Sequence, residues 1–414
     1  MVPQVGQRMG INELTLSHTK MCFSSRRMFD FPFAVMGLSF VAMALFEYLL
    51  PGGSGKDRIA VKILNGSQAA FAILCVLIHI RHSQLARWIS ISFCLLWFWL
   101  CVSGITFTDN LATIQRQWIM SFYWFSLFLF FYLRSYLYPE RLQIFILLAI
   151  FSLVVWLPAL LNFTTINFDA MNLSSRYLPQ NYIGYYIVVL FPYALMLKKN
   201  FLKIIAISLI SYGAVYSLKR GAVLALILMG FSSSLLHFAV IIKKRGRGAI
   251  VLMLLWAIAV GGGGLFIYAN PEAVNRRLHS DTGRTHIYRL CAEAIEKAEN
   301  LNLIFGHGNR QLQTKIWHEP HNDWFMLLYD HGIVGVALML NMYIALVVHL
   351  WKLSRLKSPL ALPLVSIIVL MACVQLYSTG LHLKIFGFIT GCIGLVVGCS
   401  HRLFEPPAYN RSSS

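Results

Sequence analysis

Residues 318–351 read HEPHNDWFMLLYDHGIVGVALMLNMYIALVVHLW, a polar opening that passes directly into a long apolar run. The apolar part, about 333–351, has the length of roughly 20 residues that a helix needs to cross a bilayer. The opening concentrates three histidines and three carboxylates: His318, His321, His331, Glu319, Asp323 and Asp330. This stretch predicts a membrane-spanning helix with chemically active side chains beside its start.

The composition of the whole chain agrees with a membrane protein. It has 414 residues, 58% of them hydrophobic and only 12% charged, whereas soluble domains carry about 25% charged residues. Apolar runs near 20 residues recur along its length, which predicts an all-α, polytopic membrane protein with about 12 transmembrane helices. The predicted spans are about 31–50, 61–80, 88–106, 118–136, 142–161, 181–197, 201–217, 221–242, 249–268, 333–351, 359–378 and 382–400.

The distribution of Lys and Arg predicts the orientation. With both termini in the cytoplasm, the cytoplasmic segments carry twenty Lys and Arg and the short outer loops carry eight, as the positive-inside rule requires. Seven further cations lie in the one long polar loop, which is then outside against the usual bias. The predicted parts are a cytoplasmic tail 1–30, transmembrane helices 31–268, a large periplasmic loop 269–332 with short helices, transmembrane helices 333–400 and a cytoplasmic tail 401–414.

The net charge is +19. In a membrane protein, Lys and Arg mostly reflect the topology and contact with anionic membrane lipids, so we expect no nucleic-acid partner. The eight cysteines contain no CxxC pair, and we predict neither disulfides nor a thiolate metal site.

Two helices are predicted inside the loop. Asp281 or Thr282 caps a helix that runs to about Asn300, whose apolar face has helical spacing and consists of Ile287, Leu290, Ala294, Ile295 and Ala298. Gly306 and Gly308 predict a turn after it. A second short helix, His321 to Tyr329, leads through Gly332 into the tenth span.

Arginines beside the hydrocarbon indicate an anion site. Arg220, which follows Lys219 at the outer start of a span, is costly there unless it meets an anion, and its guanidinium matches phosphate oxygens. Arg284 stands in the first turn of the loop helix, where the helix dipole also favours an anion. The alternative is that Arg220 contacts lipid head groups and that Arg284 pairs with a loop carboxylate. Lys219, Arg176 and Arg289 are further outer cations that we count with the substrate-binding residues.

His321 is the candidate for proton transfer, since histidine titrates near neutral pH and Asp323 or Glu319 can orient it. The alternative is a structural hydrogen bond, or a helix start made with Asn322. Asn322 and Asp323 are counted with the substrate-binding residues. A metal site with His318 is disfavoured by Pro320 and by the lack of an HExxH motif, so we expect neither a metal nor a cofactor.

His321-Asn322, followed after nine residues by Gly332-x-x-Gly335, resembles the signature of the O-antigen ligase and O-antigen polymerase superfamily. The arginine at an outer span start (Arg220), the Gly283-Arg284 pair opening the loop helix and the large loop between late spans agree with it. The resemblance covers roughly 180–350.

The resemblance implies an inverting, metal-independent glycosyltransferase at the periplasmic face of the bacterial inner membrane. Its donor would be a glycan linked to undecaprenyl pyrophosphate, and its acceptor lipid A–core in a ligase or a second lipid-linked glycan in a polymerase. Arg220 and Arg284 would neutralise the pyrophosphate leaving group, and His321 would act on the acceptor hydroxyl.

Three alternatives stay open beside an O-antigen ligase. A polymerase and a ligase that glycosylates proteins share the signature. A transporter of lipid-linked glycans also suits twelve spans, but transporters place polar residues at the membrane midplane, where the predicted spans hold almost no charge.

Overall fold

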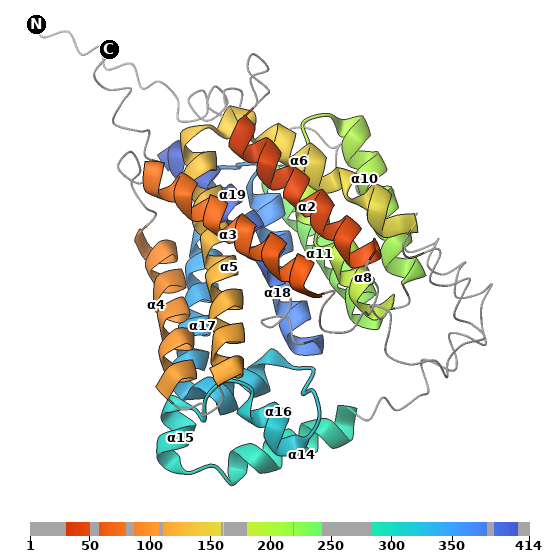
Figure 1. Ribbon diagram of the computed structural model, residues 1–414. Coiled ribbons are helices and arrows are strands. Elements are labelled where there is room, and N and C mark those ends of the chain that lie inside the picture. The colour runs from red at the N-terminus through yellow and green to blue at the C-terminus, as the bar shows by residue number, and fades with distance from the viewer. Residues whose placement is uncertain are drawn as a thin grey trace, which may run out of the picture.

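The computed structural model describes residues 30–49, 58–79, 87–106, 111–158, 160, 180–217, 219–241, 284–378 and 385–404. Throughout these ranges the chain is helical and contains no strand, which confirms the all-α prediction (Figure 1). The elements are α2 Phe31–Leu49, α3 Arg58–His79, α4 Arg87–Thr106, α5 Leu111–Leu137, the short 3-10 helix η2 Pro139–Arg141, α6 Leu142–Phe151, α8 Gln180–Val188, α9 Phe191–Leu195, α10 Asn200–Tyr216, α11 Arg220–Ile241, α14 Arg284–Glu296, α15 Asn300–Phe305, α16 Gln311–Ile316, α17 Asp323–Arg355, α18 Ala361–Tyr377 and α19 Ile385–Phe404.

The described helices are those of a multi-pass membrane protein. Five segments are long and apolar enough to cross a bilayer: Trp88–Thr106, Pro139–Pro158, Arg220–Phe238, Asp323–Arg355 and Ile385–Arg402. Five shorter apolar helices accompany them. The count of about twelve spans stays a prediction, and the predicted span 249–268 lies outside the described residues.

One predicted span is broken in the structure. The segment 181–197 consists of two helices, α8 and α9, separated by a turn at residues 189–190. Pro192 stands in the first turn of α9, and its ring cannot donate the backbone hydrogen bond that a continuous helix would send to Val188. The predicted span 181–197 therefore consists of two helices rather than one.

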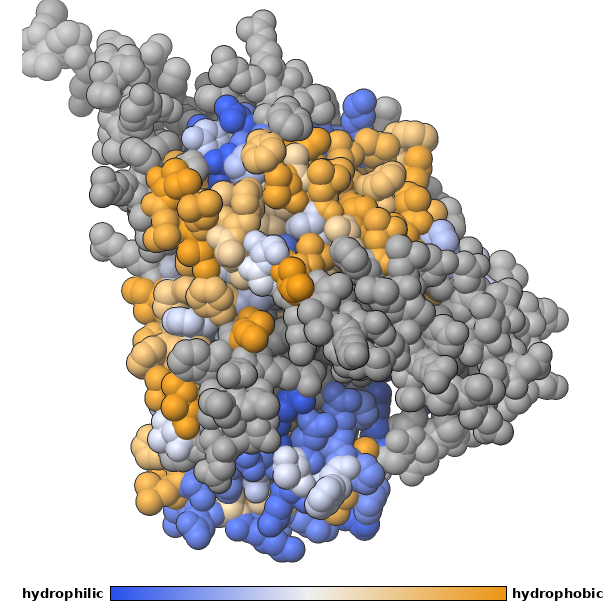
Figure 2. Space-filling model, viewed as in Figure 1, coloured by the Kyte–Doolittle hydropathy of each residue, from blue (hydrophilic) through white to orange (hydrophobic). Residues whose placement is uncertain are grey.

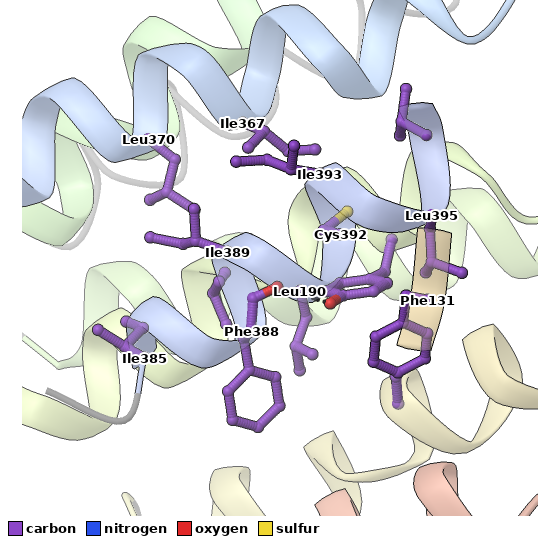
Figure 3. Close-up of a cluster of buried hydrophobic side chains, with 14 of the residues drawn as sticks. Phe131, Leu190, Ile367, Leu370, Ile385, Phe388, Ile389, Cys392, Ile393 and Leu395 are labelled. Carbon is purple, nitrogen blue, oxygen red and sulfur yellow. Dashed lines mark hydrogen bonds between the residues drawn. The ribbon is translucent and has the colours of Figure 1, made fainter. Parts of the chain in front are cut away.

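The core of the bundle is built where α19 packs on α5. Gly394 and Gly398 of α19 lie so close to α5 that a side chain at either would overlap the backbone oxygens of Phe128 and Tyr132. Small residues at such positions let two helices approach closely. Figure 3 shows the apolar side chains of α19 gathered with those of its neighbours, all of them buried.

Charged residues form a network at one end of the bundle. Asp30 is buried and pairs with Arg134 and, at 3.3 Å, with Arg141. Arg402 of α19 lies 3.6 Å from Glu140. Arg134, Arg141 and Arg402 are among the cations that the positive-inside rule assigns to the cytoplasm, but the side of the membrane stays a prediction.

The described part of the predicted loop, residues 284–332, folds into a small helical unit at one end of the bundle, at the bottom in Figure 1. Figure 2 shows hydrophilic side chains over this end, below a broad hydrophobic surface. The unit has its own core, made of Cys291, Ala294, Leu312, Ile316, Met326 and Tyr329, with Ile287, Leu290, Ile295 and Phe325 against it. Four of the five residues of the predicted apolar face are thus confirmed, and the fifth, Ala298, lies beyond the end of the helix and outside this core. The helix ends at Glu296, four residues before the predicted end, and its predicted caps Asp281 and Thr282 lie outside the described residues.

Candidate active site

The start of α17 is defined by Asn322. Its side-chain oxygen accepts hydrogen bonds from the backbone N–H groups of Trp324 (2.9 Å) and Phe325 (3.2 Å), as an N-cap residue does. Its amide nitrogen donates to the carbonyl of Leu376 at 3.4 Å, at the end of α18. His321 precedes this cap in the left-handed conformation, with φ 51°. The cap therefore fixes where the chain leaves the helix and where His321 projects.

A bend at Gly332 sets the nine residues before it apart from the rest of α17. Gly332 has φ 70° and ψ −175°, a conformation that only glycine adopts readily. The bend leaves backbone carbonyls without helical partners, and the turn after α15 supplies N–H donors for them. The backbone N–H of His307 donates to the carbonyl of Tyr329 (3.0 Å), and that of Gly308 donates to the carbonyl of Asp330 (2.9 Å). The bend is therefore held by defined hydrogen bonds, and it confirms the predicted passage through Gly332 into a span.

A neighbouring span secures the same bend from the other side. The indole N–H of Trp99 donates to the carbonyl of His331 at 2.9 Å, and Ser103 is 2.6 Å from the Nδ1 atom of His331. Gly335 leaves room for this arrangement, because a side chain there would press on His331. Gly332 and Gly335 thus serve to anchor the short first part of α17 on α4.

Asp330 connects α17 to the segment that carries His321. Its buried carboxylate accepts backbone hydrogen bonds from Arg310 and Leu312, each at 2.8 Å, at the start of α16. Residues 317–321 then connect the end of α16 to α17. Both ends of the His321 segment are therefore attached to α17, which restricts the position of the imidazole.

Three charged groups act electrostatically on the half-buried His321. Its Nδ1 atom is 4.0 Å from the carboxylate of Glu319. Burial lowers the pKa of His321; Glu319 opposes this shift, and the cations Arg284 and Lys219 lower the pKa further. The imidazole is consequently neutral at neutral pH, which is the form that can accept a proton.

Two cations from separate parts of the chain, Lys219 and Arg284, thus act electrostatically on His321. Lys219 lies just before α11, where its carbonyl accepts the N–H groups of Ala222 and Val223. Arg284 is the first residue of α14, and across the described residues it makes no hydrogen bond or ion pair. Positive helix termini and unpaired guanidinium groups favour an anion at such a place.

Arg220 stands one residue after Lys219 and is exposed at the first position of α11. It has no ion pair in the described part of the chain. Lys219, rather than Arg220, is the cation of this pair that acts on His321.

The remaining predicted residues have other surroundings. The side-chain oxygen and the side-chain nitrogen of Asn322 both make hydrogen bonds within the chain, as described above. Asp323 is buried, and Glu319 is the carboxylate that lies within 4.0 Å of the His321 imidazole. Arg289 is exposed on α14, 3.9 Å from Glu293; five residues after Arg284, it points about 140° away around the helix. Arg176 lies outside the described residues.

One side chain near the site had no signal in the sequence. Tyr185 of α8 is buried, with the ammonium of Lys219 5.7 Å from its ring centroid. A tyrosine within an apolar run is most often a packing residue, and only the structure shows its neighbours.

Across the described residues, no group of three or more His, Cys, Asp or Glu side chains is placed to hold a metal ion.

Comparison with known proteins finds a family model that matches part of the chain. Residues 205–340, about a third of the chain, match the family model described as O-Antigen ligase. The match begins within α10 and includes Lys219, Arg284 and His321, the three residues that converge. No curated protein matches the chain. The match supports the resemblance of residues 205–340 to the O-antigen ligase and polymerase superfamily.

Proposed function

We propose that this protein is an O-antigen ligase-type glycosyltransferase of the bacterial inner membrane. It transfers a glycan from undecaprenyl pyrophosphate to a sugar hydroxyl of lipid A–core at the periplasmic face. The observation that carries the proposal is the convergence of Lys219, Arg284 and a neutral His321 beside the membrane-spanning helices. The superfamily match supports the same chemistry.

The cations act on the leaving group. Breaking the bond between C1 of the sugar and the phosphate oxygen leaves negative charge on undecaprenyl pyrophosphate. Arg284, Lys219 and Arg220 would stabilise that charge, which is the role of preorganised positive groups in a transition state. The lipid tail would stay in the bilayer, which accounts for cations at the ends of membrane helices.

His321 acts on the acceptor. Its neutral imidazole takes the proton from the acceptor hydroxyl as the oxygen attacks C1 on the face opposite the departing phosphate. One glycosidic bond forms, one bond to phosphate breaks, and the configuration at C1 inverts. The proton resides on His321 until the products leave, and Glu319 stabilises the imidazolium during that interval.

The test is a transfer assay with the full-length protein in lipid nanodiscs and EDTA. The donor is an undecaprenyl-pyrophosphate-linked glycan, and lipid A–core and a second lipid-linked glycan are offered as acceptors. We expect product on lipid A–core, with losses of about 10²–10³-fold in kcat for His321→Ala and Arg284→Ala. Arg289→Ala, on the same helix but exposed, is the matched control and should retain activity.

Other outcomes separate the alternatives. A ladder of longer lipid-linked chains would make the protein a polymerase of the same superfamily. Transfer to neither acceptor, or full activity of His321→Ala, would overturn the mechanism. Comparing Lys219→Ala with Arg220→Ala then shows which cation of the pair contributes more to the leaving-group site.

A further inference from the structure

Tyr185 carries a buried hydroxyl group that lacks a hydrogen-bond partner. The side chain is only 1% exposed, and within the described part of the chain its oxygen neither donates nor accepts a hydrogen bond. Leaving such a group unpaired costs about 1–3 kcal/mol. Two other buried or half-buried tyrosines of the bundle are satisfied: Tyr193 donates to the carbonyl of Phe388 and Tyr343 to Gln375, each at 2.7 Å. The unpaired hydroxyl of Tyr185 differs from these two and therefore needs an explanation.

The hydroxyl lies against the first turn of α11. A side chain at Gly221 would overlap the oxygen of Tyr185, so the hydroxyl occupies the space that glycine leaves there. This position is one residue after Arg220 and two after Lys219. The ammonium of Lys219 is 5.7 Å from the Tyr185 ring centroid, within the range of a cation–π interaction.

The charges around Tyr185 overlap those around His321. Arg284 and Asp323 both lie close enough to the phenol to act on it electrostatically, and Arg284 and Lys219 also act on His321. Lys219 and Arg284 therefore act on both side chains, Tyr185 of α8 and His321 just before α17. An anion bound there would have a hydroxyl donor on one side.

We propose that the Tyr185 hydroxyl donates a hydrogen bond to a pyrophosphate oxygen of the lipid-linked donor, held beside Lys219 and Arg284. This inference rests on the proposed function and adds to it a residue that positions the leaving group. A phosphate oxygen is a strong acceptor, and hydrogen bonds to charged groups are stronger than those between neutral groups. No proton is transferred: the phenol only orients and stabilises the anion.

The test compares Tyr185→Phe with Tyr193→Phe in the full-length protein in nanodiscs. The probes are undecaprenyl pyrophosphate and inorganic pyrophosphate, and the readouts are binding affinity, thermal midpoint without ligand, and donor kcat/KM. For Tyr185→Phe we expect an unchanged or higher midpoint, because an unsatisfied hydroxyl is removed, with affinity and kcat/KM about tenfold lower. For Tyr193→Phe we expect a lower midpoint and unchanged affinity.

The opposite results would reject this role. If Tyr185→Phe lowers the midpoint and leaves affinity and kcat/KM at wild-type values while the wild type transfers glycan, the hydroxyl is structural and only the present inference fails. If the wild-type protein neither binds the two probes nor transfers glycan, the proposed function fails and takes this inference with it.

Discussion

His321 is a histidine whose surroundings keep it neutral. Burial and two nearby cations disfavour the imidazolium, whereas Glu319 favours it. These opposing effects suit a base that must accept a proton during the reaction and release it afterwards. In the free protein the cations keep the imidazole unprotonated, and in the complex the pyrophosphate would offset part of their charge. The donor itself would then raise the basicity of His321.

This balance can be tested by removing Glu319. Glu319→Gln takes away the one group that raises the pKa of His321, so the pKa falls further. Because His321 is inactive when protonated, the acidic limb of kcat/KM should move to lower pH, since that limb reports the free enzyme. Glu293→Gln, which removes an exposed carboxylate on α14, is the control and should leave the profile in place. A shift of the limb to higher pH in Glu319→Gln would contradict the assignment.

Asn322 permits a second test at the residue scale. Asn322→Ala removes the cap of α17 and should lower the free energy of unfolding by about 1 kcal/mol. Asn322→Ser retains a capping oxygen and should be nearly as stable as the wild type. Denaturant unfolding followed by circular dichroism measures both. Equal losses in the two variants would show that the cap does not stabilise the helix, and a loss of activity in Asn322→Ser alone would indicate contact with substrate.

Sequence reasoning selected the charged residues of the candidate site because charge is rare in this chain. Lys219 stands at the start of an apolar run, Arg284 at the start of the loop helix and His321 shortly before another apolar run, and charged groups at such places call for an explanation. Tyr185 gave no such signal, since its unpaired hydroxyl is a property of packing. Arg289 was also chosen by charge alone, and the helix turns it toward solvent.

At the scale of elements, α17 is the decisive helix. Its first nine residues carry the cap and the groups that fix His321, and the part after Gly332 enters the bundle. The sequence predicts both parts and the glycine between them. It does not predict that the carbonyls freed by the bend receive N–H groups from the turn after α15, because that pairing joins residues about 20 positions apart.

The bend predicts a contrast between two glycines. Gly332→Ala places a side chain at φ 70° and against the carbonyl of Ile304, which should cost about 1–3 kcal/mol and reduce transfer by displacing His321. Gly66→Ala on α3 meets nothing within 4 Å and should leave the protein as stable or up to about 1 kcal/mol more stable. Thermal midpoints in detergent and transfer rates check both variants. A neutral Gly332→Ala would refute the structural role of the bend.

At the scale of the molecule, the bundle depends on the contact of α5 with α19. Apolar periodicity predicted both helices as spans but could not pair residues 120–136 with residues 387–402, because an apolar helix can bury any face. The glycines of α19 identify the packed face only after the partner is known. Likewise, the only feature of the sequence that marks the break between α8 and α9 is Pro192.

This packing predicts a graded response to added methyl groups. Gly398→Ala would meet the backbone oxygen of Tyr132, which cannot move away without shifting α5. The free energy of unfolding should fall by about 1–3 kcal/mol. Gly391→Ala would meet mainly the ring of Phe131, 3.0 Å away, and the ring can adjust, so the loss should be smaller. Thermal unfolding of the two variants tests the order, and a reversed order would contradict the proposed packing face.

The hydrogen-bonded bend of α17 also has a consequence for the lipid around the protein. After Gly332 the helix has a length of roughly 35 Å, close to the thickness of a bilayer's hydrocarbon core. Since the bend is tied to α4 and to the turn after α15, it cannot open to follow a thinner or thicker bilayer. The position of His321 within the protein would then be fixed, while the head group of the donor moves with its leaflet. Transfer rates should therefore pass through a maximum when the acyl-chain length of the nanodiscs is varied.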